Sequence, residues 1–407
     1  MRFLRLSIFG LLVAALAGVS FGLGFGVGQG TNMDTAQAQA SHPNNRLRSL
    51  ITGPNEFRLL DEVWDILASE FVDTKALNKG ELGRGAIEGL IDALNDPHTS
   101  YIDAESYSRE QLEFQGSYEG IGAHVTLEES TKQLIIIAPI PGSPAESAGV
   151  KPGDKILAIN GDPADNLSLT EAVQKIKGPS GTTVTLSVLH LTDTNPVTLQ
   201  IKRGQIKTPS VLVEKLPNDL ARMRILYFSQ RTDNEVEEAL EMLESEGAKG
   251  IVIDLRNNPG GLLDTTIDVT SQFVKDGLIA IQVDKNGKEE LLRSRPGGIE
   301  SEVPIAVLIN ENSASGSEIM AGAIQDYGRG PLIGTKSFGK GSVNHLRQLS
   351  DGSALYVTVA RWLTPNGRLI EGEGLAPDIE VALTPEQMVQ GIDPQLQRAT
   401  DYLINGQ

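Results

Sequence analysis

The feature that most constrains the fold of this chain is the apolar run at residues 304–309, which leads directly into a polar segment at residues 310–318. An uninterrupted apolar run of this length is typical of a strand buried on both faces of a parallel sheet. Residues 222–228 and 250–255 have the same character, and residues 234–246 between them have a helical pattern. The alternation of strands and helices over residues 204–385 predicts an α/β core.

A serine and a lysine stand at positions suited to hydrolysis. A helix predicted for residues 316–327 begins directly after Ser315, so the unpaired N–H groups and the positive dipole end of that helix lie beside the serine. Lys340 stands between two glycines, and a lysine can accept the serine proton only where burial lowers its pKa toward neutrality. Ser315 to Glu318 also matches a Ser-x-x-Glu capping box, which needs no chemistry, so spacing alone leaves both interpretations open.

Glycines at the ends of two predicted elements are candidates for an oxyanion site. The sequence Asn-Asn-Pro-Gly-Gly at residues 257–261 follows a predicted strand, and a glycine pair lets backbone N–H groups approach a substrate oxygen closely. We expect the backbone amides of Gly260 and Gly316 to donate to the oxyanion. The alternative for residues 257–261 is a plain turn.

Composition argues against several classes of protein. A formal net charge of -18 disfavours a nucleic-acid-binding surface, because such surfaces neutralise phosphates with lysine and arginine. The chain has no cysteine, which excludes thiol catalysis, disulfides and cysteine metal sites. Its five histidines show no ligand spacing and no His-Glu-x-x-His element. We therefore expect no metal, no other cofactor and no nucleic-acid partner.

The N-terminal residues have the pattern of a targeting segment. Arg2 and Arg5 precede a mostly apolar stretch at residues 6–27, which predicts a signal sequence or a membrane anchor within residues 1–30. Residues 31–55 are polar and predict a flexible linker, with Ala-Gln-Ala at residues 38–40 similar to a small-residue cleavage site. Under either interpretation the positive-inside rule directs the rest of the chain out of the cytoplasm.

Residues 56–112 are predicted to form a helical N-terminal region, because apolar residues recur there in two stripes at helical spacing. We expect the stripes to pack on each other and on the next domain, and a homodimer through them is the alternative. The stripes are Leu59, Leu60, Val63, Ile66, Leu67 and Phe71, and then Leu82, Ala86, Ile87, Leu90, Ile91 and Leu94.

Residues 116–203 change to short strands, one helix and glycine turns. A Pro-Gly-Asp turn at residues 152–154 before an apolar strand, and an Asn-Gly turn at residues 160–161, resemble those of a PDZ domain. The resemblance implies a groove that binds an extended peptide as an added strand and captures its terminal carboxylate with backbone N–H groups. We expect the loop formed by Gly120, Ile121, Gly122 and Ala123 to bind this carboxylate, and a simple tight turn is the alternative.

Several motifs in order along the chain resemble those of the C-terminal processing (tail-specific) peptidases, over about residues 50 to 385. They are Asp-Pro-His-Thr-Ser-Tyr at 96–101, Asp-Leu-Arg-Asn-Asn-Pro-Gly-Gly at 254–261, Ser-Ala-Ser-Gly-Ser-Glu at 313–318, Phe-Gly-Lys-Gly at 338–341 and Gly-Leu-Ala-Pro-Asp at 374–378. The resemblance implies that Ser315 is the nucleophile and Lys340 the general base. The family usually has glutamine four residues after the lysine, where it helps to orient the amine, and here Asn344 stands one methylene shorter. Asp326, near the predicted helix end, is expected to pair with Arg329.

These observations predict a multidomain α/β protein with a helical N-terminal region, a PDZ-like β-rich domain, an α/β serine peptidase core and a helical tail at residues 386–407. The predicted function is that of an extracytoplasmic serine endopeptidase, periplasmic or at the cell surface, membrane-anchored or secreted. It would cleave protein or peptide substrates near their C-termini, and the resemblance implies a preference for small or apolar terminal residues. A catalytically silent, membrane-tethered PDZ scaffold is the alternative, motivated by Asn344. An esterase or lipase is disfavoured, because a peptide-binding module would serve no purpose in it.

Overall fold

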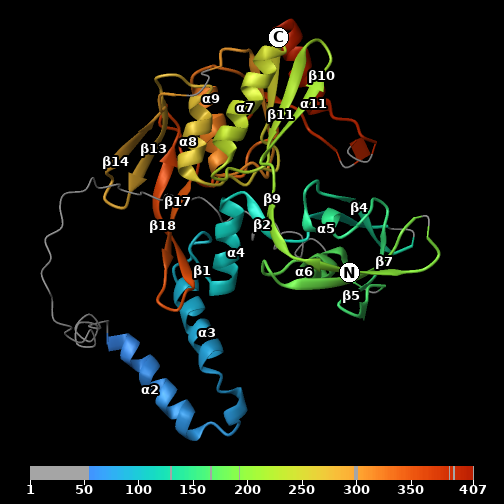
Figure 1. Ribbon diagram of the computed structural model, residues 1–407. Helices are drawn as coiled ribbons and strands as arrows, with labels where there is room; N and C mark the ends of the chain where they lie inside the picture. Colours follow the sequence, from blue (N-terminus) through green and yellow to red (C-terminus); the bar gives the residue numbers. More distant parts are fainter. Residues whose placement is uncertain are drawn as a thin grey trace, which may run out of the picture. The chain divides into compact units, whose positions relative to one another are not determined.

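The computed structural model in Figure 1 describes residues 55–128, 131–165, 167–191, 193–297, 301–384, 386–387 and 390–406. The signal sequence or anchor predicted for residues 1–30, and all but the last residue of the predicted linker, lie outside the described residues. Among the helices of the described part, none is both long enough and apolar enough to span a bilayer. The described chain forms two compact units, which divide between Tyr101 and Ile102 within the short strand β1 (Ser100–Ile102).

The first unit is helical. It contains α2 (Asn55–Glu70), the 3-10 helix η2 (Thr74–Ala76) and α3 (Lys79–Asp92). Asn78 caps α3 by accepting a hydrogen bond from the Gly80 N–H at 3.0 Å. We expected the apolar stripes to pack on each other and on the next domain. Within the helical unit most of their residues are exposed, because two helices offer too little surface to cover each other's apolar faces. The exposed members are Leu59, Leu60, Val63, Ile66, Phe71, Leu82, Leu90 and Leu94.

The second unit begins with α4 (Ala104–Phe114), which leads into the PDZ domain. A two-stranded antiparallel sheet pairs β2 with β9, and the main sheet has the order β3-β4-β5-β7-β8, with β6 beside β5. The strands are β2 (Ser117–Gly120), β3 (Ala123–Leu127), β4 (Leu134–Pro139), β5 (Lys155–Ile159), β6 (Asp162–Pro163), β7 (Thr183–Leu189), β8 (Val197–Lys202) and β9 (Gly204–Lys207), and the helices are α5 (Pro144–Ser147) and α6 (Leu169–Ile176).

The turn residues of the PDZ domain explain its local geometry. In the Pro-Gly-Asp turn, Gly153 has a φ of +83°, which suits glycine, and the Asp154 carboxylate accepts a hydrogen bond from the Lys151 N–H at 2.8 Å. A capping box at Ser168 and Glu171 starts α6. Because β3 is the last strand of the main sheet and α6 packs near it, an open sheet edge faces a helix, which is the arrangement of a peptide-binding groove.

The peptidase core is built on a six-stranded sheet of order β10-β11-β12-β15-β16-β19, parallel except for the β10–β11 pair. Alternate residues of its central strands enter two separate hydrophobic clusters, so the sheet is buried on both faces, as the apolar runs predicted. The strands are β10 (Val211–Leu216), β11 (Leu220–Ile225), β12 (Gly250–Asp254), β15 (Ile305–Ile309), β16 (Leu332–Gly334) and β19 (Ile379–Glu380).

Helices cover this sheet, and Figure 1 shows α7, α8 and α9 grouped together, apart from α11. The four helices are α7 (Thr232–Ser245), α8 (Leu263–Ser271), α9 (Gly316–Asp326) and α11 (Pro394–Asn405). Arg256 fixes the start of α11 by donating to the carboxylates of Asp254 and Asp393, each at 2.8 Å. A second, antiparallel sheet contains β13 (Leu278–Asp284), β14 (Glu289–Arg293), β17 (Ser342–Gln348) and β18 (Ala354–Leu363).

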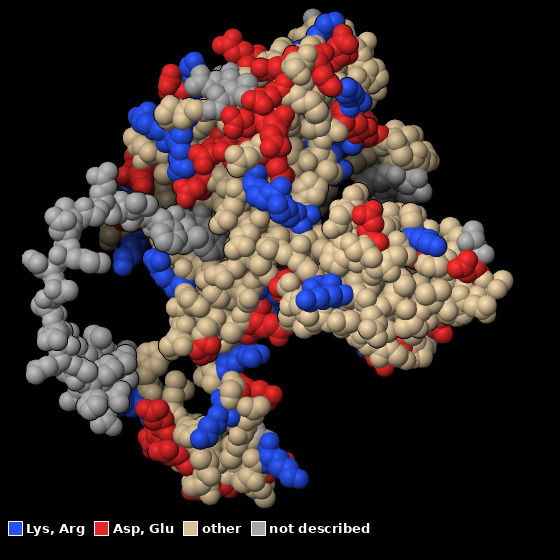
Figure 2. All heavy atoms as spheres, in the orientation of Figure 1, with Lys and Arg blue, Asp and Glu red and all other residues tan. Residues whose placement is uncertain are grey.

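Acidic side chains gather over the part of the peptidase core where α7 lies, as Figure 2 shows. The α7 sequence Thr-Asp-Asn-Glu-Val-Glu-Glu-Ala-Leu-Glu-Met-Leu-Glu-Ser accounts for much of this charge. Its apolar members Val236, Leu240 and Leu243 are buried, because they recur on one side of the helix. This surface would repel nucleic-acid phosphates.

Candidate active site

The topology of the parallel sheet brings two polar loops together. β12 and β15 are parallel neighbours, so the loops that follow them leave the same edge of the sheet. Residues 257–261 follow β12, and Ser315 follows β15. A Cβ placed on Gly260 would lie 2.8 Å from the Gly316 nitrogen and 2.9 Å from the Ser315 Cβ. The glycine pair therefore packs directly against the predicted nucleophile.

Ser315 has an unusual backbone conformation at the start of α9. Its φ is +54° and its ψ is -112°, a combination that non-glycine residues rarely adopt, and its side chain is 1% exposed. Strained residues of this kind persist only where the surrounding structure holds them, and they cluster at active sites. Ser315 caps the N-terminus of α9, where the sequence predicted a helix start. Contacts beyond those of an ordinary helix cap hold it in this conformation.

Glu318 supplies that restraint. Its carboxylate is fully buried and accepts four hydrogen bonds: from the Ser315 N–H at 2.9 Å, the Lys340 N–H at 2.9 Å, the Gly339 N–H at 2.7 Å and the Ser337 hydroxyl at 2.6 Å. One oxygen, Oε2, serves both Ser315 and Lys340, so their amide nitrogens lie within two hydrogen-bond lengths of each other. The structure thus brings Ser315 and Lys340 together, although 25 residues separate them in the sequence.

Lys340 is buried as a lysine base requires. Its side chain is 1% exposed, and burial lowers its pKa to about 8, while the nearby carboxylates of Glu371, Glu110 and Glu318 act in the opposite direction. Glycine at position 341 is needed for this packing, because a Cβ there would overlap the Glu371 backbone. Near pH 8, about half of such a lysine is a neutral amine that can accept a proton.

The predicted oxyanion donors differ in their hydrogen bonding. The Gly260 N–H donates to the Asn258 side-chain oxygen at 2.8 Å and is thereby engaged. Within the part of the chain that the structure describes, the N–H groups of Gly316 and of Gly261 donate no hydrogen bond. A Cβ at Gly261 would overlap the Phe228 carbonyl, so only glycine fits this close approach.

Asn344, the third predicted site residue, is fully buried in β17. Its Oδ1 accepts a hydrogen bond from the Ser342 hydroxyl at 3.3 Å, and its Nδ2 donates to Thr358 of β18 at 3.2 Å. The pairing of β17 with β18 shifts register between Val343 and Asn344. The side chain therefore braces the strand that directly follows Lys340.

One sequence prediction at this site is wrong, and two residues were overlooked. Asp326 pairs with Arg368, and not with Arg329, because Arg329 donates to backbone carbonyls at residues 301 and 303. Asn258 was missed, although an asparagine in the loop after a buried strand is a candidate for holding a turn. Glu110 was missed because nothing in its helix indicates that its charge acts on Lys340.

In the PDZ domain, the four predicted loop residues lie at the start of the groove. Ile121 is buried in the domain core, and Gly122 has a φ of +75°. The Gly122 carbonyl accepts hydrogen bonds from the Ile140 N–H and the Ser143 hydroxyl, both at 2.9 Å. Over the described residues, the N–H groups of Ile121 and Gly122 donate no hydrogen bond. Ala123 begins the edge strand β3, and Gly120 ends β2, where it pairs with β9.

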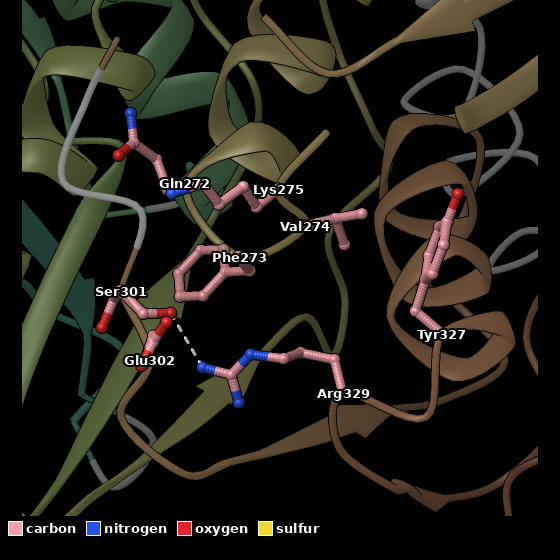
Figure 3. Close-up of a pocket in the computed structure, with 8 residues that line it drawn as sticks. All are labelled: Gln272, Phe273, Val274, Lys275, Ser301, Glu302, Tyr327 and Arg329. Atoms are coloured by element: carbon pink, nitrogen blue, oxygen red, sulfur yellow. Dashed lines mark hydrogen bonds between the residues drawn. The ribbon is translucent and has the colours of Figure 1, made fainter. Parts of the chain in front are cut away.

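A separate pocket of about 420 Å³ is lined by Tyr327, the residue that ends α9 at the opposite end from Ser315. Figure 3 shows the residues that line it. Tyr327 and Arg329 line it on one side, and Gln272 and Phe273 line it on the other. Arg329 points into it and donates to the Ser301 carbonyl at 2.8 Å. Because an eleven-residue helix is roughly 16 Å long, this pocket is not part of the site around Ser315 and Lys340.

Comparisons with known proteins agree with this geometry. Residues 219–381 match the model of Peptidase family S41, residues 111–189 that of the PDZ domain, and residues 14–106 that of the activating protease CtpB N-terminal domain. The carboxy-terminal processing protease CtpA of Bacillus subtilis is 37% identical over 83% of this chain and 71% of its own length. The carboxyl-terminal-processing protease of Synechocystis is 36% identical over 84% of this chain and 82% of its own length.

A solved structure shows the same type of fold. An S41 protease from Bacteroides fragilis is 19% identical, with a TM-score of 0.50, and the match covers 71% of this chain and 83% of that one. The photosystem II D1 C-terminal processing protease is 29% identical, with a TM-score of 0.48, over 80% of this chain and 86% of that one.

Proposed function

Because this chain belongs to the carboxy-terminal processing proteases of peptidase family S41, serine peptidases that here carry a PDZ domain, we propose that Ser315 is its nucleophile and Lys340 its general base. The observation that carries the proposal is the shared Glu318 oxygen, which joins the backbone of a strained serine to that of a buried lysine. A helix cap alone would account for the Ser315 contact and not for the Lys340 contact.

The proposed reaction uses few groups. The neutral Lys340 amine accepts the Ser315 proton as the hydroxyl oxygen attacks the scissile carbonyl, and the resulting ammonium then protonates the leaving amine. The acyl-enzyme is hydrolysed when Lys340 takes a proton from water. We propose that the backbone N–H groups of Gly316 and Gly261 stabilise the oxyanion. Gly261 takes the place of the predicted donor Gly260, because the Gly260 N–H already donates a hydrogen bond to Asn258.

Asn344 is proposed to replace the glutamine that is usual in the family. Its amide is anchored to Ser342 and Thr358 in the strand after Lys340, so it supports the lysine segment. An alanine at position 344 would leave the buried Ser342 hydroxyl and the half-buried Thr358 hydroxyl without this partner, at a cost of about 1–3 kcal/mol in the free energy of unfolding.

The PDZ domain is proposed to select substrates by their C-termini. We propose that an extended peptide pairs with the edge strand β3 and that its carboxylate binds the N–H groups of Ile121 and Gly122, with Gly120 and Ala123 setting the loop path. Support comes from these two N–H groups, which donate no hydrogen bond among the described residues. Ile121 anchors this loop because its side chain is buried in the hydrophobic core of the PDZ domain. We propose a preference for substrates with small or apolar terminal residues, which such a groove accommodates without buried charge.

We propose an extracytoplasmic location, periplasmic or at the cell surface, with residues 1–30 acting as a signal sequence or an anchor. Support comes from the charge pattern, in which Arg2 and Arg5 precede an uncharged apolar stretch. Fractionation of cells that produce the full chain, compared with a Arg2→Glu, Arg5→Glu variant, tests this location. Export of the parent is expected, and impaired export of the variant.

A homodimer through α2 and α3 is also proposed. The exposed apolar residues of these helices, such as Leu59, Val63, Leu90 and Leu94, would remain in water in a single chain. Burying these side chains against a second copy would stabilise the dimer by roughly 25 cal/mol for each Å² of apolar surface removed from water. Light scattering is expected to find a dimer that a Val63→Asp, Leu90→Asp variant dissociates, and a monomeric parent would contradict the proposal.

The first test compares the parent chain with Ser315→Ala and Lys340→Ala on an unfolded reporter that carries an apolar C-terminal tail. Both folded variants are expected to lose cleavage by at least about 1,000-fold. Ser313→Ala, two residues before the nucleophile, is a matched control because it also removes a buried hydroxyl. A parent that binds the tail and does not cleave it would favour the silent PDZ scaffold. Cleavage of simple lipid esters without peptide cleavage would favour an esterase.

A further inference from the structure

Helix α4 lies outside the peptidase-family match and yet packs on the catalytic core. Its last residue, Phe114, packs with Leu262 and Tyr356, and the Phe114 carbonyl accepts a hydrogen bond from the Gln230 N–H at 2.8 Å. Leu262 directly follows the glycine pair beside Ser315. One helical turn before Phe114 stands Glu110, on the same side of α4.

Glu110 is a largely buried carboxylate. Its Oε2 is shielded from solvent and accepts no hydrogen bond from the described residues. Burial raises its pKa to about 7, while the Tyr356 hydroxyl and the charge of Lys340 act in the opposite direction and Glu113 adds to the rise. Tyr356, itself 3% exposed, has its pKa raised by burial and by Glu110. The carboxylate is therefore enclosed, and its charge interacts with that of Lys340.

Three carboxylates raise the pKa of Lys340, and they differ in their other hydrogen-bond and ion-pair partners. Glu318 is held by its four hydrogen-bond donors, and Glu371 lies 3.7 Å from the Arg361 guanidinium. Glu110 forms no ion pair with an arginine within the described part of the chain, so Lys340 is the cation that acts on it. Among the three, Glu371 raises the pKa of Lys340 most and Glu110 raises it next, ahead of Glu318.

We propose that Glu110 is a positioning residue of the active site: from helix α4 it faces Lys340 beside Tyr356, stabilises the ammonium form, and so sets the pH above which the dyad becomes active. Glu110 lies between residues 106 and 111 and is covered by none of the three family matches. The inference rests on the proposed Ser315/Lys340 dyad.

The sign of the effect follows from the charge. Replacing Glu110 with glutamine removes a negative charge, so the ammonium form of Lys340 loses stabilisation and its pKa falls. The neutral amine is then present at lower pH. The acidic limb of the pH profile of kcat/KM is expected to move to lower pH by about 0.5–1 unit. Because Glu110 itself becomes neutral below about pH 7, the gain is expected mainly between about pH 7 and 8, where Glu110→Gln would be about 2- to 3-fold more active than the parent, with little change at pH 9.5.

The experiment measures pH profiles of the full chain from pH 5.5 to 9.5 for the parent, Glu110→Gln and the control Glu105→Gln. Glu105 is on the same helix, pairs with Arg109 at the surface and does not act on Lys340, so its variant should keep the parental profile. Labelling of Ser315 by a small fluorophosphonate over the same pH range gives a readout that does not depend on the PDZ groove. Glu110→Asp, which keeps the charge, should restore a limb near that of the parent.

The outcomes separate the two proposals. A parent without an acidic limb near pH 8 would contradict Lys340 as the base. A parent with this limb and a Glu110→Gln variant with the same limb would overturn the role of Glu110 alone. If Glu110→Gln does not fold, Tyr356→Phe serves instead, because it removes the hydroxyl that favours the ionised form of Glu110. The acidic limb should then move in the same direction by a smaller amount. An acidic limb that does not move would overturn the proposal.

Discussion

Glu318 shows at the scale of single residues how one side chain can serve both a helix cap and the proposed catalytic site. The Ser-x-x-Glu pattern predicted a cap, and Glu318 does accept a hydrogen bond from the Ser315 N–H. The same carboxylate also holds Lys340, Gly339 and Ser337, which the pattern could not indicate. The two interpretations that spacing left open are therefore compatible.

Glu318→Gln tests this restraint. Each Glu318 oxygen accepts two hydrogen bonds, so an amide nitrogen in place of one oxygen would leave two donors without an acceptor. We therefore expect kcat/KM to fall about 10- to 100-fold, mainly through kcat. The free energy of unfolding should fall by about 1–3 kcal/mol in a denaturant titration. Glu311→Gln is the control, because Glu311 is exposed on the same loop and contacts only Thr335 among the described residues. Full activity of Glu318→Gln would show that the dyad does not depend on this carboxylate.

At the scale of elements, the site depends on how closely two loops approach at the edge of a parallel sheet. Residues 257–261 follow β12, and residues 310–315 follow β15, so strand pairing alone places them side by side. The bridge between Phe228 and Gly261 extends this contact to the segment that follows β11. The loops leave no room for a side chain at positions 260 and 261, and both residues are glycine.

Gly261→Ala should be strongly destabilising. Gly261 has a φ of +150°, and a Cβ would overlap the Phe228 carbonyl, so backbone strain and overpacking add together. We expect a loss of about 3–5 kcal/mol in the free energy of unfolding, measured by urea denaturation. Gly247→Ala is the matched control: its φ of +75° is also left-handed, but a Cβ there meets nothing within 4 Å, so about 1 kcal/mol should be lost. Equal losses would contradict the steric account.

At the scale of the whole molecule, the PDZ domain is an insertion with a narrow base. The chain enters it through β2 and leaves through β9, and Gly120 pairs with Gly204 in that antiparallel sheet. Its hydrophobic core is separate from that of the peptidase. The domain is therefore a module separate from the peptidase core, as its proposed role in substrate selection requires.

Replacing residues 121–203 with Asn-Gly tests this separation, because a two-residue hairpin turn can join Gly120 to Gly204. The shortened chain should stay folded and keep its reactivity toward a serine-directed probe. It should lose its preference for a reporter with a free C-terminus over one with an amidated C-terminus, a preference of about 10-fold or more in the parent. A preference that persists after the excision would locate tail recognition in the peptidase core.

The sequence by itself determined the α/β core, the PDZ domain and the candidate dyad, because strand periodicity, turn glycines and ordered motifs are local properties of the chain. It did not determine that α2 and α3 leave their apolar faces exposed, that Asp326 pairs with Arg368, or that Gly260 is engaged by Asn258. Nor could it show that Glu318 links Ser315 to Lys340, or that Glu110 acts on Lys340 from 230 residues away. Burial, ion pairing and a lowered lysine pKa depend on which distant residues meet, and only the tertiary structure decides that.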